Sequence, residues 1–105
     1  ANSYVNRGIA LHVLKKDDLA LADFTKAISL DSTLSVAYLN RGITYAGLEN
    51  YENAVYDFSQ ALKYEPTMII AYYQRIQAYK ALKQYDLAMN DIAQCQQFGV
   101  QVPQS

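Results

Sequence analysis

The sequence has few of the residues that most often carry chemistry. It contains no tryptophan, one cysteine, one histidine and two prolines among 105 residues. The single Cys95 excludes an internal disulfide and a zinc site built from cysteines. His12 has no second histidine with which to hold a metal, and no glycine-rich phosphate loop is present. We therefore expect no cofactor, no metal and no catalytic activity.

The chain also lacks an excess of charge of one sign. Nine basic and ten acidic residues give a net charge of −1, with an isoelectric point of about 5.7. Because nucleic-acid-binding modules usually show a basic excess, we expect no nucleic-acid partner. No apolar run approaches the roughly 20 residues that cross a bilayer, so we do not expect this segment to insert into a membrane.

What the sequence does have is an internal repeat of 34 residues. Five positions are identical in three successive copies: Tyr4, Tyr38 and Tyr72; Arg7, Arg41 and Arg75; Leu14, Leu48 and Leu82; Ala20, Ala54 and Ala88; and Asp23, Asp57 and Asp91. Chance would supply about 0.1 such positions at ordinary residue frequencies. A period of this length predicts helical units that bury a core only by stacking. The units run over 1–34, 35–68 and 69–102 of one domain, with 103–105 as a tail.

Within each copy the apolar residues follow a helical period. In the second copy one face carries Tyr38, Gly42, Tyr45 and Leu48, and the next carries Ala54, Phe58, Ala61 and Leu62. This pattern predicts six helices, at about 2–15, 18–30, 36–48, 52–64, 70–82 and 86–98. Acidic residues at the start of each second helix (Asp18, Glu52 and Asp86) complement the helix dipole. Gly99 is expected to cap the last helix.

The arginine and aspartate positions repeat together. A track of free arginines could attract acidic ligands, but each copy also supplies a carboxylate that would neutralise its arginine. We therefore interpret Arg41 and Asp57, with their equivalents, as structural ion pairs within or between repeats.

These repeated positions resemble the tetratricopeptide repeat. The second copy carries the full pattern, with Tyr38, Gly42, Tyr45, Ala54, Phe58, Ala61 and Pro66. The third copy departs most, because Ile76 replaces glycine, Ile92 replaces the aromatic residue and Cys95 replaces alanine. The resemblance implies an all-α, right-handed superhelical solenoid of three helix-turn-helix repeats, whose first helices line a concave groove.

The resemblance also implies that partners bind in this groove, on exposed positions of the first helices. Our candidate peptide-binding residues are Asn6, Asn40, Gln74, Tyr73, Leu39, Ile43, Ile9 and Gln77, with Val5 beside them. Asn6, Asn40 and Gln74 are in register, and each amide offers a donor and an acceptor to an extended peptide backbone. The alternative is that the amides cap turns or face water.

Some members of this family hold the C-terminal carboxylate of heat-shock chaperones with lysine, arginine and asparagine side chains. The corresponding residues here are Val5, Ile9, Asn40, Ile70 and Gln74, of which only Asn40 fits. Without cations the carboxylate would be left uncompensated, so we do not expect this type of binding.

The function implied by the resemblance is that of an adaptor or scaffold that binds a peptide segment of a partner protein. The alternative is a structural spacer or a self-associating segment of a longer solenoid. The opening helix looks internal, so we expect a fragment of a longer protein whose uncapped N-terminal end could self-associate. RNA binding, as in related 35-residue repeats, is disfavoured by the acidity and by the strict 34-residue period.

Overall fold

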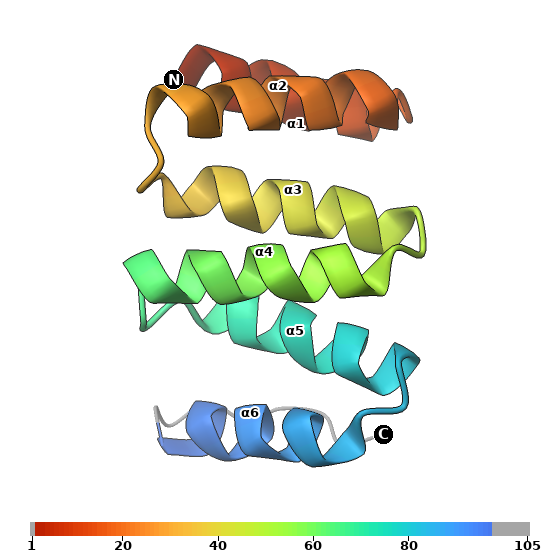
Figure 1. The fold of residues 1–105 in the computed structure, drawn as a ribbon, viewed down its shortest axis with the longest axis vertical. Coiled ribbons are helices and arrows are strands. Elements are labelled where there is room, and N and C mark those ends of the chain that lie inside the picture. The colour runs from red at the N-terminus through yellow and green to blue at the C-terminus, as the bar shows by residue number, and fades with distance from the viewer. Residues whose placement is uncertain (1, 98–105) are drawn as a thin grey trace.

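The computed structural model describes residues 2–97, and all the regular structure in that range is helical (Figure 1). The helices are α1 (Asn2–Val13), α2 (Asp17–Leu30), α3 (Ser35–Gly47), α4 (Tyr51–Tyr64), α5 (Ile69–Ala81) and α6 (Tyr85–Gln97). The predicted all-α repeat fold is confirmed, and each predicted helix end lies within two residues of the observed one. Leu14 and Leu48 follow the ends of α1 and α3 and are exposed, so they are not part of the core. The predicted cap at Gly99 lies outside the described residues.

The three repeats follow one another in chain order along the long axis of the molecule, and α1 and α2 overlap in this view (Figure 1). Each helix contacts the next one, and the first helices also contact each other, α1 with α3 and α3 with α5. Over residues 2–97 the second helices α2, α4 and α6 make no such contacts among themselves. The first helices therefore approach each other more closely than the second helices do. This difference curves the stack, with α1, α3 and α5 on its inner side.

Each first helix ends in the same left-handed turn. Lys15, Glu49 and Lys83 have φ of 62°, 62° and 61°, and they stand 34 residues apart. In the middle turn the backbone N–H of Asn50 donates to the carbonyl of Tyr45 at 2.9 Å, which satisfies a carbonyl at the end of α3. Glycine usually occupies this left-handed position, and its absence left these caps without a signal in the sequence.

The core of each repeat depends on a close approach between its two helices. Phe24 and Phe58 are fully buried against Gly8 and Gly42. A Cβ atom at Gly42 would lie only 2.6 Å from Cε1 of Phe58, so no larger residue fits there beside the ring. In the third copy the pair becomes Ile76 and Ile92, which belong to one cluster with Ala88 and Cys95. The departure from the repeat pattern therefore exchanges a small–large pair for two residues of middle size.

Candidate functional site

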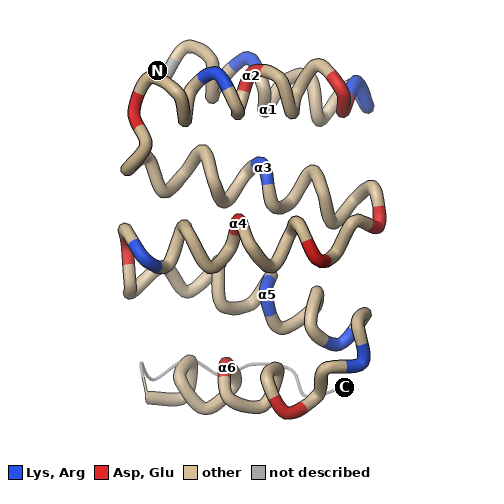
Figure 2. The backbone as a smooth tube through the Cα atoms, viewed as in Figure 1, with Lys and Arg blue, Asp and Glu red and all other residues tan. Residues whose placement is uncertain are grey.

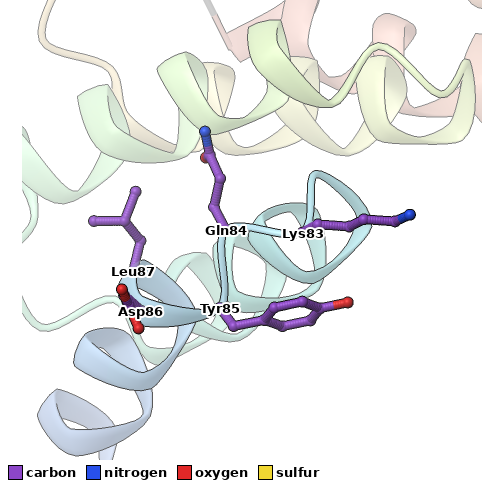
Figure 3. A pocket seen from close by; sticks show the side chains of 5 residues that line it. All are labelled: Lys83, Gln84, Tyr85, Asp86 and Leu87. Carbon is purple, nitrogen blue, oxygen red and sulfur yellow. The ribbon is translucent and has the colours of Figure 1, made fainter.

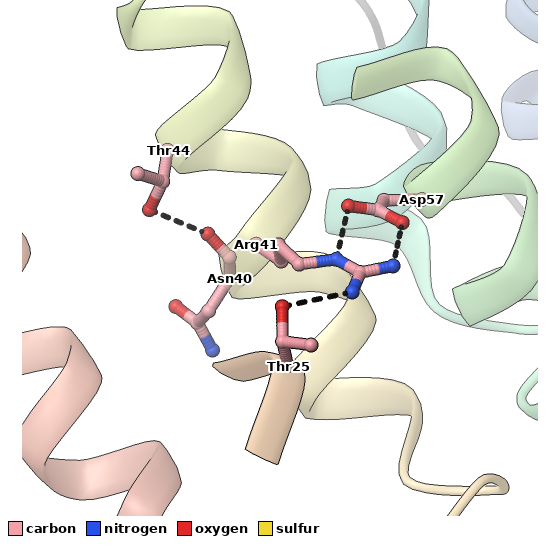
Figure 4. Close-up of polar contacts among 5 residues, drawn as sticks. All are labelled: Thr25, Asn40, Arg41, Thr44 and Asp57. Carbon is pink, nitrogen blue, oxygen red and sulfur yellow. Dashed lines mark hydrogen bonds and ion pairs between the residues drawn. The ribbon is translucent and has the colours of Figure 1, made fainter. Parts of the chain in front are cut away.

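The three arginine–aspartate pairs have one geometry. In the middle repeat Nε and Nη2 of Arg41 donate to the two carboxylate oxygens of Asp57, each at 2.8 Å (Figure 4). Arg7 with Asp23, and Arg75 with Asp91, form the same two-point bond over 2.6–2.8 Å. Such bidentate bonds are among the stronger hydrogen bonds in proteins. The interpretation of these residues as structural ion pairs is confirmed.

The remaining guanidinium nitrogen of two of these arginines reaches into the preceding repeat. Nη1 of Arg41 donates to the hydroxyl of Thr25 in α2 at 3.2 Å (Figure 4). Nη1 of Arg75 donates to the hydroxyl of Ser59 in α4 at 3.0 Å. Thr25 and Ser59 stand 34 residues apart, so a hydroxyl column was present in the sequence and was missed. Each of these two arginines ties three helices together.

Burial distinguishes the pairs. The side chains of Arg41 and Asp57 are 15% and 1% exposed, and burial raises the pKa of Asp57, against the opposing hydrogen bond from Arg41. At the first pair the side chain of Arg7 is 64% exposed, and its hydrogen bond lowers the pKa of Asp23. The middle pair is therefore part of the core, whereas the first pair lies at an open face.

The predicted groove residues differ in how much surface they offer. Asn6, Gln77, Ile9 and Tyr73 are exposed, and Asn40, Ile43 and Gln74 are half-buried. They come from α1, α3 and α5, on the inner side of the curve.

The expected exposure of Val5 and Leu39 was wrong. Val5 belongs to the buried cluster around Phe24, and Leu39 belongs to the cluster around Phe58. Both residues adjoin the core tyrosines on their helices, and the stacking of the next repeat closes over them. Val5 and Leu39 therefore pack beneath the inner face, and almost none of their own side-chain surface is exposed to a ligand.

One of the predicted amides is partly engaged. Nδ2 of Asn40 donates to the carbonyl of Val36, one turn earlier in α3, at 2.8 Å. This bond uses one of the two N–H groups of the amide, and the amide oxygen takes no part in it. The three amides are thus unequal, with Asn6 the most open and Asn40 tied to its own helix.

The helices of the inner side contain no acidic residue; every Asp and Glu in the described chain lies in a second helix, a turn or an inter-repeat loop (Figure 2). The three arginines on these helices are paired with aspartates of the second helices. His12 Nδ1 lies 3.0 Å from Asp17 Oδ1, at the start of α2. What the predicted site offers is amide groups and apolar surface, with Lys80 near one end.

A separate hollow of about 330 Å³ lies at the turn before α6 (Figure 3). Its lining comes from five consecutive residues, Lys83–Leu87, and none of them is a predicted groove residue. Over the described residues no group of histidine, cysteine, aspartate and glutamate side chains is placed to hold a metal ion. Within the same range no helix combines the length and the apolar character needed to cross a bilayer.

The repeated helix pairs, the buried phenylalanines and the glycine contacts define a helical repeat protein. Sequence profiles described as tetratricopeptide repeat match residues 1–34 and 35–68, and the chain belongs to the tetratricopeptide repeat family. A comparison with curated proteins gave no significant match.

Among solved structures the chain is similar to other tetratricopeptide repeat domains. The second domain of Spaghetti (RPAP3), bound to the HSP90 peptide SRMEEVD, is 25% identical with a TM-score of 0.84, over 87% of this chain and 84% of that one. The second domain of human RPAP3, in complex with the HSP70 peptide SGPTIEEVD, is 26% identical with a TM-score of 0.85, over 90% and 78%. YrrB, described as having an unusual peptide-binding site, is 28% identical with a TM-score of 0.82, over 87% and 47%.

Proposed function

We propose that this chain is a protein-interaction module, an adaptor or scaffold that holds an extended, uncharged peptide segment of a partner against α1, α3 and α5. The observation that carries the proposal is the composition of this face. Asn6, Asn40 and Gln74 follow one another at 34-residue intervals, beside the exposed Ile9 and Tyr73. Amides can bond to a peptide backbone of any sequence, while apolar side chains select apolar neighbours.

The similar structures support peptide binding by this chain. The residues on its inner face, however, argue against the acidic peptides that two of those structures contain. Two of them are complexes with peptides that end in the acidic sequence EEVD. In this chain the positions that would need cations carry Val5, Ile70 and Gln74, and Val5 is buried. A peptide carboxylate would lose water on this face without gaining a partner charge.

We therefore predict that the chain discriminates against the HSP90 peptide SRMEEVD. Its affinity should be at least about 30-fold weaker than that of the second RPAP3 domain, because lost charge pairs of this kind cost about 2–5 kcal/mol. Fluorescence anisotropy with one labelled peptide and both domains measures the difference. Equal affinities would show that the charge argument does not hold for this face.

The groove proposal is tested with a double substitution, Asn40→Ala with Tyr73→Ala. The matched control is Asn53→Ala with Tyr56→Ala, which removes the same two residue types from exposed positions on α4. Capture of protein partners from lysate, compared quantitatively by mass spectrometry, should fall at least about 10-fold for the first variant and stay unchanged for the control. Circular dichroism verifies that both variants remain folded. Unchanged capture by the groove variant would refute binding on this face.

A further inference from the structure

The inner face of the stack is organised in rows that cross the helices. In α3 the residues Val36, Asn40 and Ile43 follow one another at intervals of four and three positions, so they lie on one face of the helix. Along the helix axis Asn40 lies between its two apolar neighbours, about 6 Å from one and about 4.5 Å from the other. Because the copies are in register, these positions form an amide row with a flanking row on each side. The amide row is Asn6, Asn40 and Gln74, and the apolar residues of the flanking rows are Ile9 with Ile43, and Val36 with Ile70.

The flanking rows offer apolar surface to a ligand. The residues Ile9, Val36 and Ile70 are each more than a third exposed, and Ile43 is half-buried. Each flanking row has two apolar residues, which lie one repeat apart on successive first helices. A ligand that uses both rows must therefore present, on each of two sides, apolar side chains at the spacing of the repeats.

The spacing of the repeats selects the conformation of such a ligand. The helix α3 contacts both α1 and α5, and the axes of helices in contact lie about 8–10 Å apart. A polyproline II helix has three residues per turn and rises about 3.1 Å per residue, so its side chains return to one side every ~9.3 Å. In a β-strand the side chains on one side recur every ~6.8 Å, which does not match the spacing of either flanking row.

The amide row argues against an α-helical ligand. Such a ligand also has a suitable period, since its residues at i and i+7 lie about 10.5 Å apart on nearly the same face. The backbone N–H and C=O groups of a helix are bonded within the helix, however, so the amides of this chain would lose water without gaining a partner. A polyproline II segment has no internal hydrogen bonds, and each of its residues, proline included, keeps a carbonyl group available.

The bond that Asn40 makes to its own helix suits a ligand of this kind. Since Nδ2 donates to the carbonyl of Val36, the amide is held in place and keeps one N–H group and its oxygen for a ligand. The N–H group can donate to a ligand carbonyl, and the oxygen can accept from the N–H of a residue other than proline. The inner helices carry no acidic residue and their arginines are paired with aspartates, so the face complements an uncharged segment.

We propose that the peptide held on this face is an uncharged polyproline II segment of a partner protein, with proline or an aliphatic residue at two of every three positions. Its backbone lies over the amide row. Two of its three sides face the two flanking rows, and the third side points to solvent. This inference rests on the proposed function, because it names the class of peptide that the same face binds.

The test uses a peptide of four successive Leu-Pro-Gln units, in which each proline and the leucine before it favour the polyproline II conformation. Nitrogen-15 NMR of the full chain, titrated to millimolar peptide, observes the side-chain amide groups of asparagine and glutamine directly. We expect chemical-shift changes at the side chains of Asn6, Asn40 and Gln74, with a Kd below about 1 mM. The control peptide contains the same residues in an order without the period of three, and it should bind at least about 10-fold more weakly.

Two variants of the protein make the test specific. The double substitution Ile9→Gln with Ile70→Gln removes an exposed aliphatic side chain from each flanking row and should weaken binding of the Leu-Pro-Gln peptide at least about 10-fold. The matched control, Leu19→Gln with Met89→Gln, removes exposed aliphatic side chains from α2 and α6 and should leave the affinity unchanged. Circular dichroism verifies that both variants remain folded.

The inference is overturned by equal affinity for the reordered peptide, by equal affinity of the variant at Ile9 and Ile70, or by an absence of shifts at the three amides at millimolar peptide. The capture experiment with Asn40→Ala and Tyr73→Ala tests the proposed function separately. If that variant loses its partners while the Leu-Pro-Gln peptide does not bind, polyproline II recognition is refuted and binding on the inner face stands. Unchanged capture by that variant refutes both.

Discussion

Replacing Gly42 with isoleucine is expected to destabilise the chain by about 3 kcal/mol or more, and a second replacement, Phe58→Ile, is expected to restore much of that loss. Gly42 faces Phe58 so closely that even a Cβ atom would come within 2.6 Å of the ring. The third repeat shows the alternative solution, since it carries Ile76 and Ile92 at the same two positions. The double substitution copies that solution into the second repeat.

The measurement is a double-mutant cycle from urea unfolding of the four proteins. We expect the two substitutions to couple favourably by about 2 kcal/mol, because Phe58→Ile alone leaves a cavity that isoleucine at position 42 fills. Gly47→Ala is the control, since a Cβ there meets only His12 at an ordinary 3.7 Å and should not destabilise the chain. Additive losses in the cycle would show that isoleucine at position 42 does not compensate for the loss of the Phe58 ring. That result would contradict this explanation of the isoleucine pair in the third repeat.

The second large effect is expected from Arg41→Ala. The substitution leaves the carboxylate of Asp57 buried without its cation, and breaking a buried pair in this way costs about 3–5 kcal/mol. A loss of that size is a large part of the stability of a small domain and should lower Tm by at least about 12 °C. Calorimetry measures it. Arg7→Ala, at the open end, should cost much less, because solvent screens an exposed pair.

The Arg41→Ala variant also distinguishes a structural role of Arg41 from a role in ligand binding. If Arg41 serves only the repeat stack, Arg41→Ala should retain its partner affinity at a temperature where it is still folded. A loss of partner affinity with an unchanged Tm would instead mean that Arg41 contacts ligand. The two outcomes are distinguished by measuring capture and thermal unfolding on the same preparation.

The architecture could be predicted from the sequence because a 34-residue period constrains every copy to pack alike. Tyr38 recurs in all three copies, and Phe58 and Ala61 recur in the first copy, for packing reasons, and so the helices and their order followed from them. The hydroxyl bonds of Thr25 and Ser59 were missed because the third copy carries Ala93 at the equivalent position, so a hydroxyl does not recur in all three copies. The left-handed caps were missed because Lys15, Glu49 and Lys83 do not carry the glycine that signals such a turn.

The candidate site was predicted less well than the fold. Periodicity assigns a residue to a face of its own helix, but burial depends on how far the neighbouring repeat reaches over that face. Leu39 was placed on the inner surface, and the next repeat covers it. Asn40 was a candidate for contact with a peptide backbone, and its own helix takes one of its two N–H donors. The burial of Leu39 and the hydrogen bond of Asn40 both depend on side-chain geometry, which the repeat pattern does not specify.

Between the helices of residues 2–97, contacts run only between helices that are near one another in the stack. Stability in such an array is close to a sum of nearest-neighbour interfaces, and the terminal helices have one neighbour fewer than those in the middle. Opening should therefore begin at the ends and move inward, and amide protons of α3 and α4 should exchange most slowly. A ligand that spans α1, α3 and α5 would bridge units that otherwise open separately, and would make the whole array unfold as a single cooperative unit.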